Sequence, residues 1–146
     1  MAQICKLVMA AVVMLGNVAA HADPQAFGDY DVYQNIFTTD FLQPEVARAY
    51  GVTRANDHAL INISVRKRLP TGGDEAVAAS VSGTLGDLIH KHELEFREIV
   101  EQGAIYYIAE FEFINEETLY FDIKVTPASE TATFKLDFQK KLYVGE

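Results

Sequence analysis

The chain has 146 residues, 49% of them apolar and 11% aromatic, which is enough for one domain to close a core without metals or crosslinks. Its 12 Lys and Arg stand against 21 Asp and Glu, a formal charge of −9 at pH 7. Nucleic acid and anionic membrane surfaces are therefore disfavoured as partners, and the only basic cluster, residues 66–68, is interpreted as a solvated rim.

The first 22 residues have the organisation of a secretory signal peptide. Lys6 gives a short positive region, residues 7–16 form an apolar run, and Ala20-His21-Ala22 places small residues where a signal peptidase needs them. The run is shorter than the ~20 residues of a membrane-spanning helix, so a signal is favoured over a membrane anchor or a buried helix. We predict cleavage after Ala22, a periplasmic location, no stable membrane insertion, and one mature domain over residues 23–146.

Cleavage removes the only cysteine, Cys5, and all three methionines. The mature chain then has no residues for a disulfide, a zinc–thiolate site, a Cys nucleophile or a Met-rich copper site. Because Lys6 is the one charged residue that is lost, the formal charge changes from −9 to −10. We predict that packing alone holds the fold.

The first part of the mature chain is predicted to contain three strands and one helix. Strands are expected over residues 28–37, 58–67 and 75–83, where apolar and polar residues alternate. A short helix is expected from Pro44, which suits the first helical position, to Tyr50, with Gly51 ending it. Small side chains over residues 75–83 would let other layers cover both faces of that strand, and residues 85–89 are expected to form a loop.

The most strand-like stretch is AIYYIAEFEF, residues 104–113. It lies between predicted strands over residues 91–101 and 118–126, and the three are expected to share one apolar face. Its second face changes from apolar to acidic between Ile108 and Glu110, so one end should be covered on both sides and the other exposed to water. A functional site is expected first at this boundary. The residues of its core face are Ile105, Tyr107, Ala109 and Phe111.

A last strand over residues 131–144 brings the number of strands to seven, at the spacing of a small antiparallel sandwich. The lack of long amphipathic helices argues against helical bundles and parallel α/β folds. We predict an all-β fold, a seven-stranded immunoglobulin-like β-sandwich with one short helix, although the Cys pair and buried Trp of antibody domains are missing. A small lipocalin-like barrel is the alternative.

His90 and His92 are the weak candidates for a metal site. At a spacing of i, i+2 on a strand, they would project from one face and supply two ligands to zinc or copper, with His58 or Glu93 as a third. A polar entry to a strand is the simpler interpretation, since no Cys or Met accompanies them. We predict no metal and no cofactor.

Acidic residues gather around the central strand. Glu110 and Glu112 share a face with Tyr106, and Arg97 is expected on the outward face of the preceding strand with Glu93 and Glu95. Cross-strand pairing of Arg and Glu at a solvent face is the simplest explanation. Alternatively, two carboxylates could act as the acid and base of a hydrolase, which requires a concave site that raises one pKa. Tyrosines also alternate with polar residues on the predicted strands, and any of them that lies on an outward face could form a platform for a peptide or a sugar. These tyrosines are Tyr30, Tyr33, Tyr106, Tyr107 and Tyr120.

Five blocks of the chain carry a resemblance to a known family. They are FLQPEVA at 41–47 with Tyr50-Gly51, NISV at 62–65, LEFREI at 94–99, IYYIAEF at 105–111 and NEETL at 115–119. Over essentially the whole mature chain, the sequence resembles a proteobacterial family of small exported proteins known only as a domain of unknown function. The resemblance implies a periplasmic β-sandwich and supplies no activity. It draws attention to polar residues in these blocks, namely Arg97, Glu98, Asn115, Glu116 and Glu117.

The chain contains no GxSxG motif and no phosphate-binding glycine loop. We therefore predict a non-catalytic periplasmic binding or accessory protein that contacts another envelope protein. A small-ligand or metal carrier is the alternative, and a carboxylate-dependent hydrolase is a distant third. The sequence does not determine the oligomeric state. The candidate binding residues are Tyr106, Glu110, Glu112, Arg97, Asn115 and Glu116.

Overall fold

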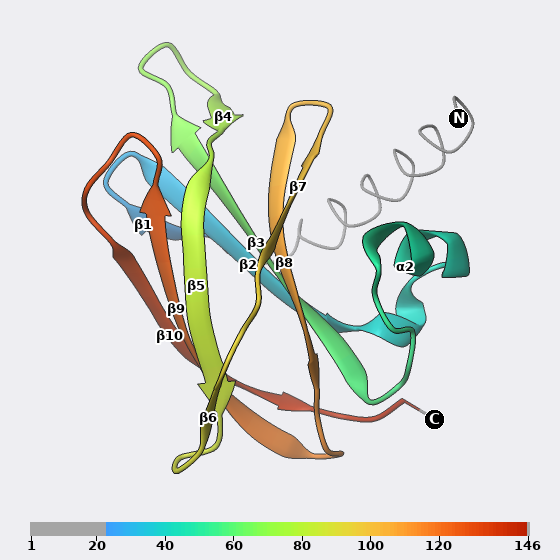
Figure 1. Ribbon diagram of the computed structural model, residues 1–146. Coiled ribbons are helices and arrows are strands. Elements are labelled where there is room, and N and C mark those ends of the chain that lie inside the picture. Colours follow the sequence, from blue (N-terminus) through green and yellow to red (C-terminus); the bar gives the residue numbers. More distant parts are fainter. Residues whose placement is uncertain (1–22, 146) are drawn as a thin grey trace.

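The computed structural model describes residues 23–145, so the predicted signal peptide over residues 1–22 lies outside the described part. Within that part, ten strands form two antiparallel sheets that pack face to face (Figure 1). In chain order the elements are β1 (Gln25–Phe27), β2 (Tyr30–Thr38), the 3-10 turn η2 (Thr39–Phe41), α2 (Pro44–Tyr50), β3 (His58–Arg68), β4 (Asp74–Ala76), β5 (Ala79–Gly86), β6 (Lys91–Glu93), β7 (Arg97–Glu101), β8 (Ala104–Glu112), β9 (Glu117–Pro127) and β10 (Phe134–Leu142).

Sheet I has the strand order β1-β2-β3-β8-β7, with β4 also paired to β3, and sheet II has the order β10-β9-β5-β6. The predicted β-sandwich is confirmed, whereas the lipocalin-like alternative is wrong, because both sheets are open at their edges within residues 23–145. The immunoglobulin-like connectivity stays a prediction. None of the helices in this part of the chain is long and apolar enough to cross a membrane.

The predicted number of seven strands is wrong because the chain changes sheet inside two of the predicted strands. Residues 75–83 divide between β4 in sheet I and β5 in sheet II, and residues 91–101 divide between β6 in sheet II and β7 in sheet I. The short strand β1, which pairs with β2, is an addition. Alternation of apolar and polar residues continues through a crossover, so the sequence pattern alone does not reveal where the chain changes sheet.

The central strands also differ from the prediction. β8 and β9 are consecutive but lie in opposite sheets, so they do not share one apolar face. They face each other across the core instead, where the rings of Phe111 and Phe121 meet edge to face at 5.5 Å between centroids. The core face predicted for β8 is confirmed, since Tyr107, Ala109 and Phe111 are buried.

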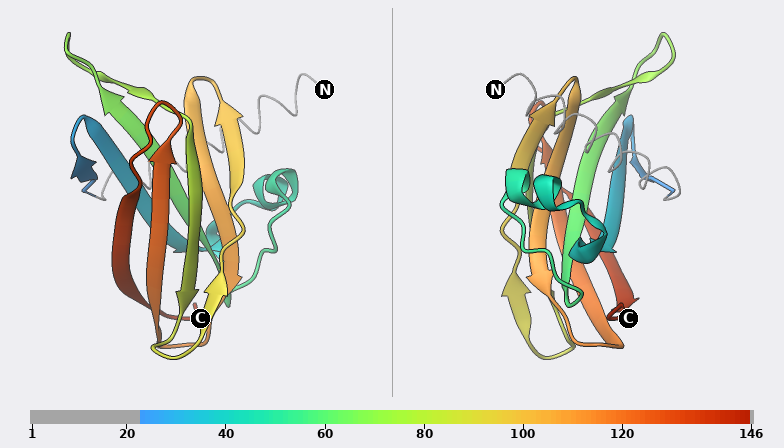
Figure 2. Two further views of the ribbon diagram at one scale, coloured as in Figure 1. Left: turned by 60° about the vertical axis from the view of Figure 1, so that its left-hand side comes forward. Right: turned by 90° about the vertical axis from the view of Figure 1, so that its right-hand side faces the viewer.

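Helix α2 covers the outer face of sheet I, as the right-hand view of Figure 2 shows. The helix predicted from Pro44 to Tyr50 is confirmed, and Gly51 ends it in the left-handed conformation with φ of 66°. Buried side chains of the helix, Val46 and Tyr50, pack with Ile108 of β8 in a second apolar cluster. Each such buried side chain contributes about 1.5–3 kcal/mol, which a helix of two turns needs in order to form.

Candidate functional site

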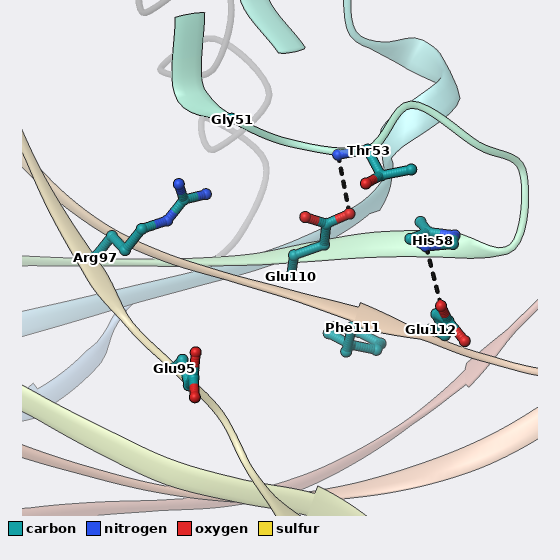
Figure 3. Close-up of a pocket in the computed structure, with 8 residues that line it drawn as sticks. All are labelled: Gly51, Thr53, His58, Glu95, Arg97, Glu110, Phe111 and Glu112. Atoms are coloured by element: carbon teal, nitrogen blue, oxygen red, sulfur yellow. Dashed lines mark hydrogen bonds and ion pairs between the residues drawn. The ribbon is translucent and has the colours of Figure 1, made fainter. Parts of the chain in front are cut away.

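An open depression of about 570 Å³ lies where α2 ends and the outer face of β8 becomes exposed (Figure 3). Ile108 is 1% exposed beneath the helix cluster, while the side chain of Glu112, further along β8, is 79% exposed. The outer face of β8 therefore changes from covered to exposed beyond Ile108, as predicted, and the depression lies on the exposed side of this boundary. Its lining residues are Gly51, Thr53, His58, Glu95, Arg97, Glu110, Phe111 and Glu112.

Strand register brings the polar lining residues together. His58 at the start of β3 is directly opposite Glu112 of β8. Two residues further along the same face, Leu60 of β3 is opposite Glu110 of β8. Arg97 of β7 is opposite Ile108, one row before Glu110 on the same face. Directly paired residues of antiparallel strands share a face, so these side chains from three strands point to the same side of sheet I.

Hydrogen bonds fix the inner part of the depression. The backbone N–H of Thr53 donates to Oε1 of Glu110 at 3.0 Å, which ties the loop after α2 to β8 (Figure 3). His58 lies between two carboxylates, with Nε2 3.3 Å from Oε1 of Glu112 and Nδ1 2.8 Å from Oδ1 of Asp57. The hydrogen bond to His58 is the main reason that the pKa of Asp57 is lowered. These contacts orient one loop and two side chains in advance of any ligand.

Arg97 is the guanidinium of the depression, and it packs against the end of α2. A Cβ atom on Gly51 would lie 3.2 Å from a terminal nitrogen of Arg97, so the glycine leaves room for the arginine. The predicted pairing of Arg97 with the neighbouring glutamates is not seen, since no ion pair among residues 23–145 joins them. Glu93 is also separated from this group, because it belongs to β6 of sheet II. The carboxylates of Glu95, Glu110 and Glu112 thus line the depression together with one guanidinium, which leaves an excess of carboxylates.

The remaining predicted binding residues lie outside the depression. Tyr106 is half-buried in the cluster beneath α2, and burial raises the pKa of its hydroxyl. Asn115 and Glu116 form the turn between β8 and β9, where Oδ1 of Asn115 accepts a hydrogen bond from the N–H of Val144 and Glu116 has a φ of 64°. In the structure, these two residues shape a turn and hold the C-terminal segment.

The two histidines singled out for metal binding are not on one strand. His90 lies in the turn before β6, with Nδ1 3.2 Å from Oδ2 of Asp87, and only His92 belongs to β6. The i, i+2 argument therefore fails, because it requires both residues in the extended strand. Residues 23–145 contain no group of three or more His, Cys, Asp or Glu side chains placed to hold a metal ion.

Two contacts outside the depression explain other polar residues of the sequence. The hydroxyl of Tyr107 donates to Oε2 of Glu98 at 2.8 Å and accepts the N–H of Ala79 at 2.8 Å, which joins β8 of sheet I to β5 of sheet II. In the basic cluster, Arg66 pairs with Asp74 at 2.8 Å and Arg68 pairs with Asp31 at 3.0 Å. Both arginines are thus engaged within the chain.

Sequence reasoning missed Thr53 as a site residue. Its contribution is a backbone N–H, which every residue except proline carries, so no signal in the sequence could have identified it. His58 was considered only as a ligand to accompany His90 and His92. Its pairing with Glu112 depends on the register between β3 and β8, which is set by packing across the whole sheet.

The solved structures similar to this chain share its sandwich fold. A DUF4426 family protein from Pseudomonas aeruginosa PAO1 is 37% identical, with a TM-score of 0.74 over 86% of this chain and 97% of that one. A copper-bound variant of FetP from uropathogenic Escherichia coli strain F11 is 14% identical, with a TM-score of 0.59 over 86% and 96% of the two chains. FetP as isolated after expression in the periplasm of E. coli is 13% identical, with a TM-score of 0.60 over the same shares.

At these identities the FetP structures support the fold alone. No curated protein sequence matches the chain significantly. The family DUF4426, described as a domain of unknown function, matches residues 24–145. With that match and the identity to the Pseudomonas protein, the expected family resemblance is confirmed, and the chain belongs to the DUF4426 family.

Proposed function

We propose that the protein is a non-catalytic binding module of the periplasm that contacts another envelope protein through the depression at the end of α2. One observation carries the proposal, namely the excess of carboxylates over the single guanidinium of Arg97 in a concave site. The partner that fits this chemistry is a segment rich in Lys or Arg, because its cations would meet exposed carboxylates of Glu95 and Glu112.

The strength expected of such a contact follows from its exposure. Individual ion pairs at a protein surface contribute only about 0–1 kcal/mol and are screened by salt. Several pairs must therefore act together, and the contact should weaken as the salt concentration rises. The hydrogen bonds of Glu110 and His58 lower the entropic cost of binding, because part of the site is already ordered.

A periplasmic location is part of the proposal. It rests on the signal-peptide organisation of residues 1–22. The test is to separate periplasm from cytoplasm in cells that make the full chain, and to determine the N-terminus by mass spectrometry. A mature protein that begins at Asp23 in the periplasm is expected; a full-length protein in the cytoplasm contradicts this location.

Binding is tested by affinity capture from an envelope extract of the protein's own host. Immobilised residues 23–146 are compared with a double variant, Glu95→Gln and Glu112→Gln. The matched control is Glu45→Gln and Glu75→Gln, which removes the same charge from exposed positions away from the depression. We expect a protein that is retained by wild type and control, lost with the site variant and released by salt. Equal retention by both variants, or none by wild type, contradicts the proposal.

A metal carrier is the second candidate. His58 and Glu112 already lie 3.3 Å apart in the depression, and the fold resembles that of FetP, one variant of which was solved with copper bound. Against it stands the lack of a third suitable side chain around them in residues 23–145. Calorimetric titration of residues 23–146 with Cu²⁺ decides this candidate: saturable heat that His58→Ala abolishes would support it, and no saturable heat would remove it.

A further inference from the structure

Among residues 23–145, no helix or strand covers the outer face of sheet II (Figure 2). Helix α2 lies over sheet I, on the opposite side of the molecule (Figure 2). On β5, Ser80 and Ser82 are exposed, so the predicted covering of both faces of this strand does not occur within residues 23–145. Because these side chains are small, another protein surface could approach the outer face of β5 closely.

The charges on this face are arranged in rows of like sign. Lys124 of β9 is directly opposite Lys135 of β10, and in the next row Asp122 is directly opposite Asp137. Like charges at directly opposed positions destabilise a sheet. Within the described residues, neither lysine pairs with either aspartate, and Lys91 is the sole basic partner of Asp122, at 4.0 Å. The other three charges, those of Lys124, Lys135 and Asp137, have no ion-pair partner among residues 23–145.

We propose that this face binds the same face of a second copy of the chain. Consider a two-fold axis that lies midway between sheet II of one copy and sheet II of the other. The axis runs parallel to these sheets and perpendicular to their strands, and it passes midway between the lysine row and the aspartate row. Rotation about this axis reverses the order of the rows, and each strand then lies over the same strand of the other copy. Lys124 and Lys135 of one copy then face Asp122 and Asp137 of the other, and the reverse holds as well. The pattern is self-complementary, as a two-fold interface requires.

The shape of the face agrees with this occupant. Ser82 lies in the lysine row and Thr84 in the aspartate row, so β5 adds only short side chains to the contact. Sheets that stack face to face lie about 10 Å apart, a gap that Lys and Asp side chains from the two copies can span. Four strands about 5 Å apart give a contact on the order of 1,000 Å² in total, which is typical of weak complexes. The dimer is therefore weak and sensitive to salt.

Charge reversal tests the pairing directly. One variant carries Asp122→Lys and Asp137→Lys, and the other carries Lys124→Asp and Lys135→Asp. We expect wild-type residues 23–146 to dimerise at low ionic strength and to dissociate in high salt, as measured by sedimentation equilibrium. Each variant alone should be monomeric, and an equimolar mixture should form a heterodimer. A monomeric wild type at low salt, or a mixture that stays monomeric while both variants are folded, overturns the proposal.

A milder substitution separates the dimer from the fold. Asp137→Asn removes the like-charge opposition to Asp122, so the diluted monomer should become more resistant to urea while dimerisation weakens by roughly tenfold. A solely structural role for Asp137 would move stability without moving dimerisation, and that result contradicts the proposal. Because the depression is on the opposite sheet, its variants Glu95→Gln and Glu112→Gln should leave dimerisation unchanged, whether or not the proposed function holds.

Discussion

The hydroxyl of Tyr107 joins the two sheets and explains why this polar group lies near the core. Burial is the main cause of the raised pKa of Tyr107, so its hydroxyl stays protonated and can donate to Glu98. The same oxygen accepts a hydrogen bond from the N–H of Ala79, the first residue of β5, which follows the crossover from β4 in sheet I to β5 in sheet II. The sequence predicted that Tyr107 faces the core, but it did not identify these partners, because they depend on the crossover.

Tyr107→Phe tests this bridge. Loss of the hydroxyl leaves the partly buried N–H of Ala79 without its acceptor, which should lower the free energy of unfolding by about 1–3 kcal/mol in urea titrations. Tyr120→Phe is the matched control, since no hydrogen bond of that hydroxyl occurs among the described residues. Equal stability of the two variants would show that the bridge does not stabilise the sandwich.

The turn before β6 gives a prediction that depends on pH. Backbone N–H groups of His90 and Ile89 donate to Oδ1 of Asp87, and chiefly for this reason its pKa is lowered to about 2. The folded pKa is below the unfolded value of 3.8, so ionised Asp87 stabilises the fold above that pH, and this contribution is lost as the pH falls toward 2.

Asp87→Asn keeps an oxygen acceptor but cannot ionise. The difference in unfolding free energy between wild type and Asp87→Asn should be constant above about pH 5 and should change between about pH 4 and 2. Urea titrations across that range measure it, and the carboxyl carbon shift of Asp87 in NMR spectra gives its midpoint. A midpoint near 4, with no change in the difference, argues that these hydrogen bonds are absent in solution.

At the level of elements, the sequence was most informative where local chemistry decides. Pro44 and Gly51 correctly predicted the two ends of α2. The change from apolar to acidic residues after Ile108 correctly predicted where the outer face of β8 is no longer covered by the helix. The crossovers were not predicted, because every second residue faces the core both before and after the chain changes sheet. The alternation of apolar and polar residues therefore continues through the crossover. The composition of the depression was predictable only in part. Glu110, Glu112 and Arg97 follow from alternation, whereas Thr53 and His58 enter through the path of a loop and the register of β3.

Gly51→Ala tests how the end of α2 shapes the depression. Any residue other than glycine in the left-handed conformation costs about 1–2 kcal/mol, and here the new Cβ also approaches Arg97. Gly103→Ala is the control, because Gly103 has a similar φ of 79° and nothing within 4 Å of the added atom. Gly51→Ala should destabilise more than the control, and Arg97→Ala should remove that excess. An equal loss at both glycines would show that Arg97 does not pack on the cap.

For the whole molecule, the two outer faces divide the surface between two kinds of contact. Sheet I carries the acidic depression beside α2, and sheet II carries the rows of like charges on β9 and β10. Composition gave the overall negative charge but not this division, which arises from the strand order of the two sheets. A dimer through sheet II would leave both depressions open, so two copies could engage one partner and gain avidity from weak individual contacts.

The central claim is that the carboxylates at the end of α2 bind a basic segment of another envelope protein. The most direct measurement places a photo-cross-linking amino acid at Thr53, an exposed lining residue whose backbone N–H is kept, in the full chain and in cells of its own host, and identifies the adduct by mass spectrometry. We expect one envelope protein to be linked through a Lys- or Arg-rich segment, with the yield reduced by Glu112→Gln and not by Glu45→Gln. A cross-linker at Glu75 that gives the same adducts, or no adduct at Thr53, would contradict the claim.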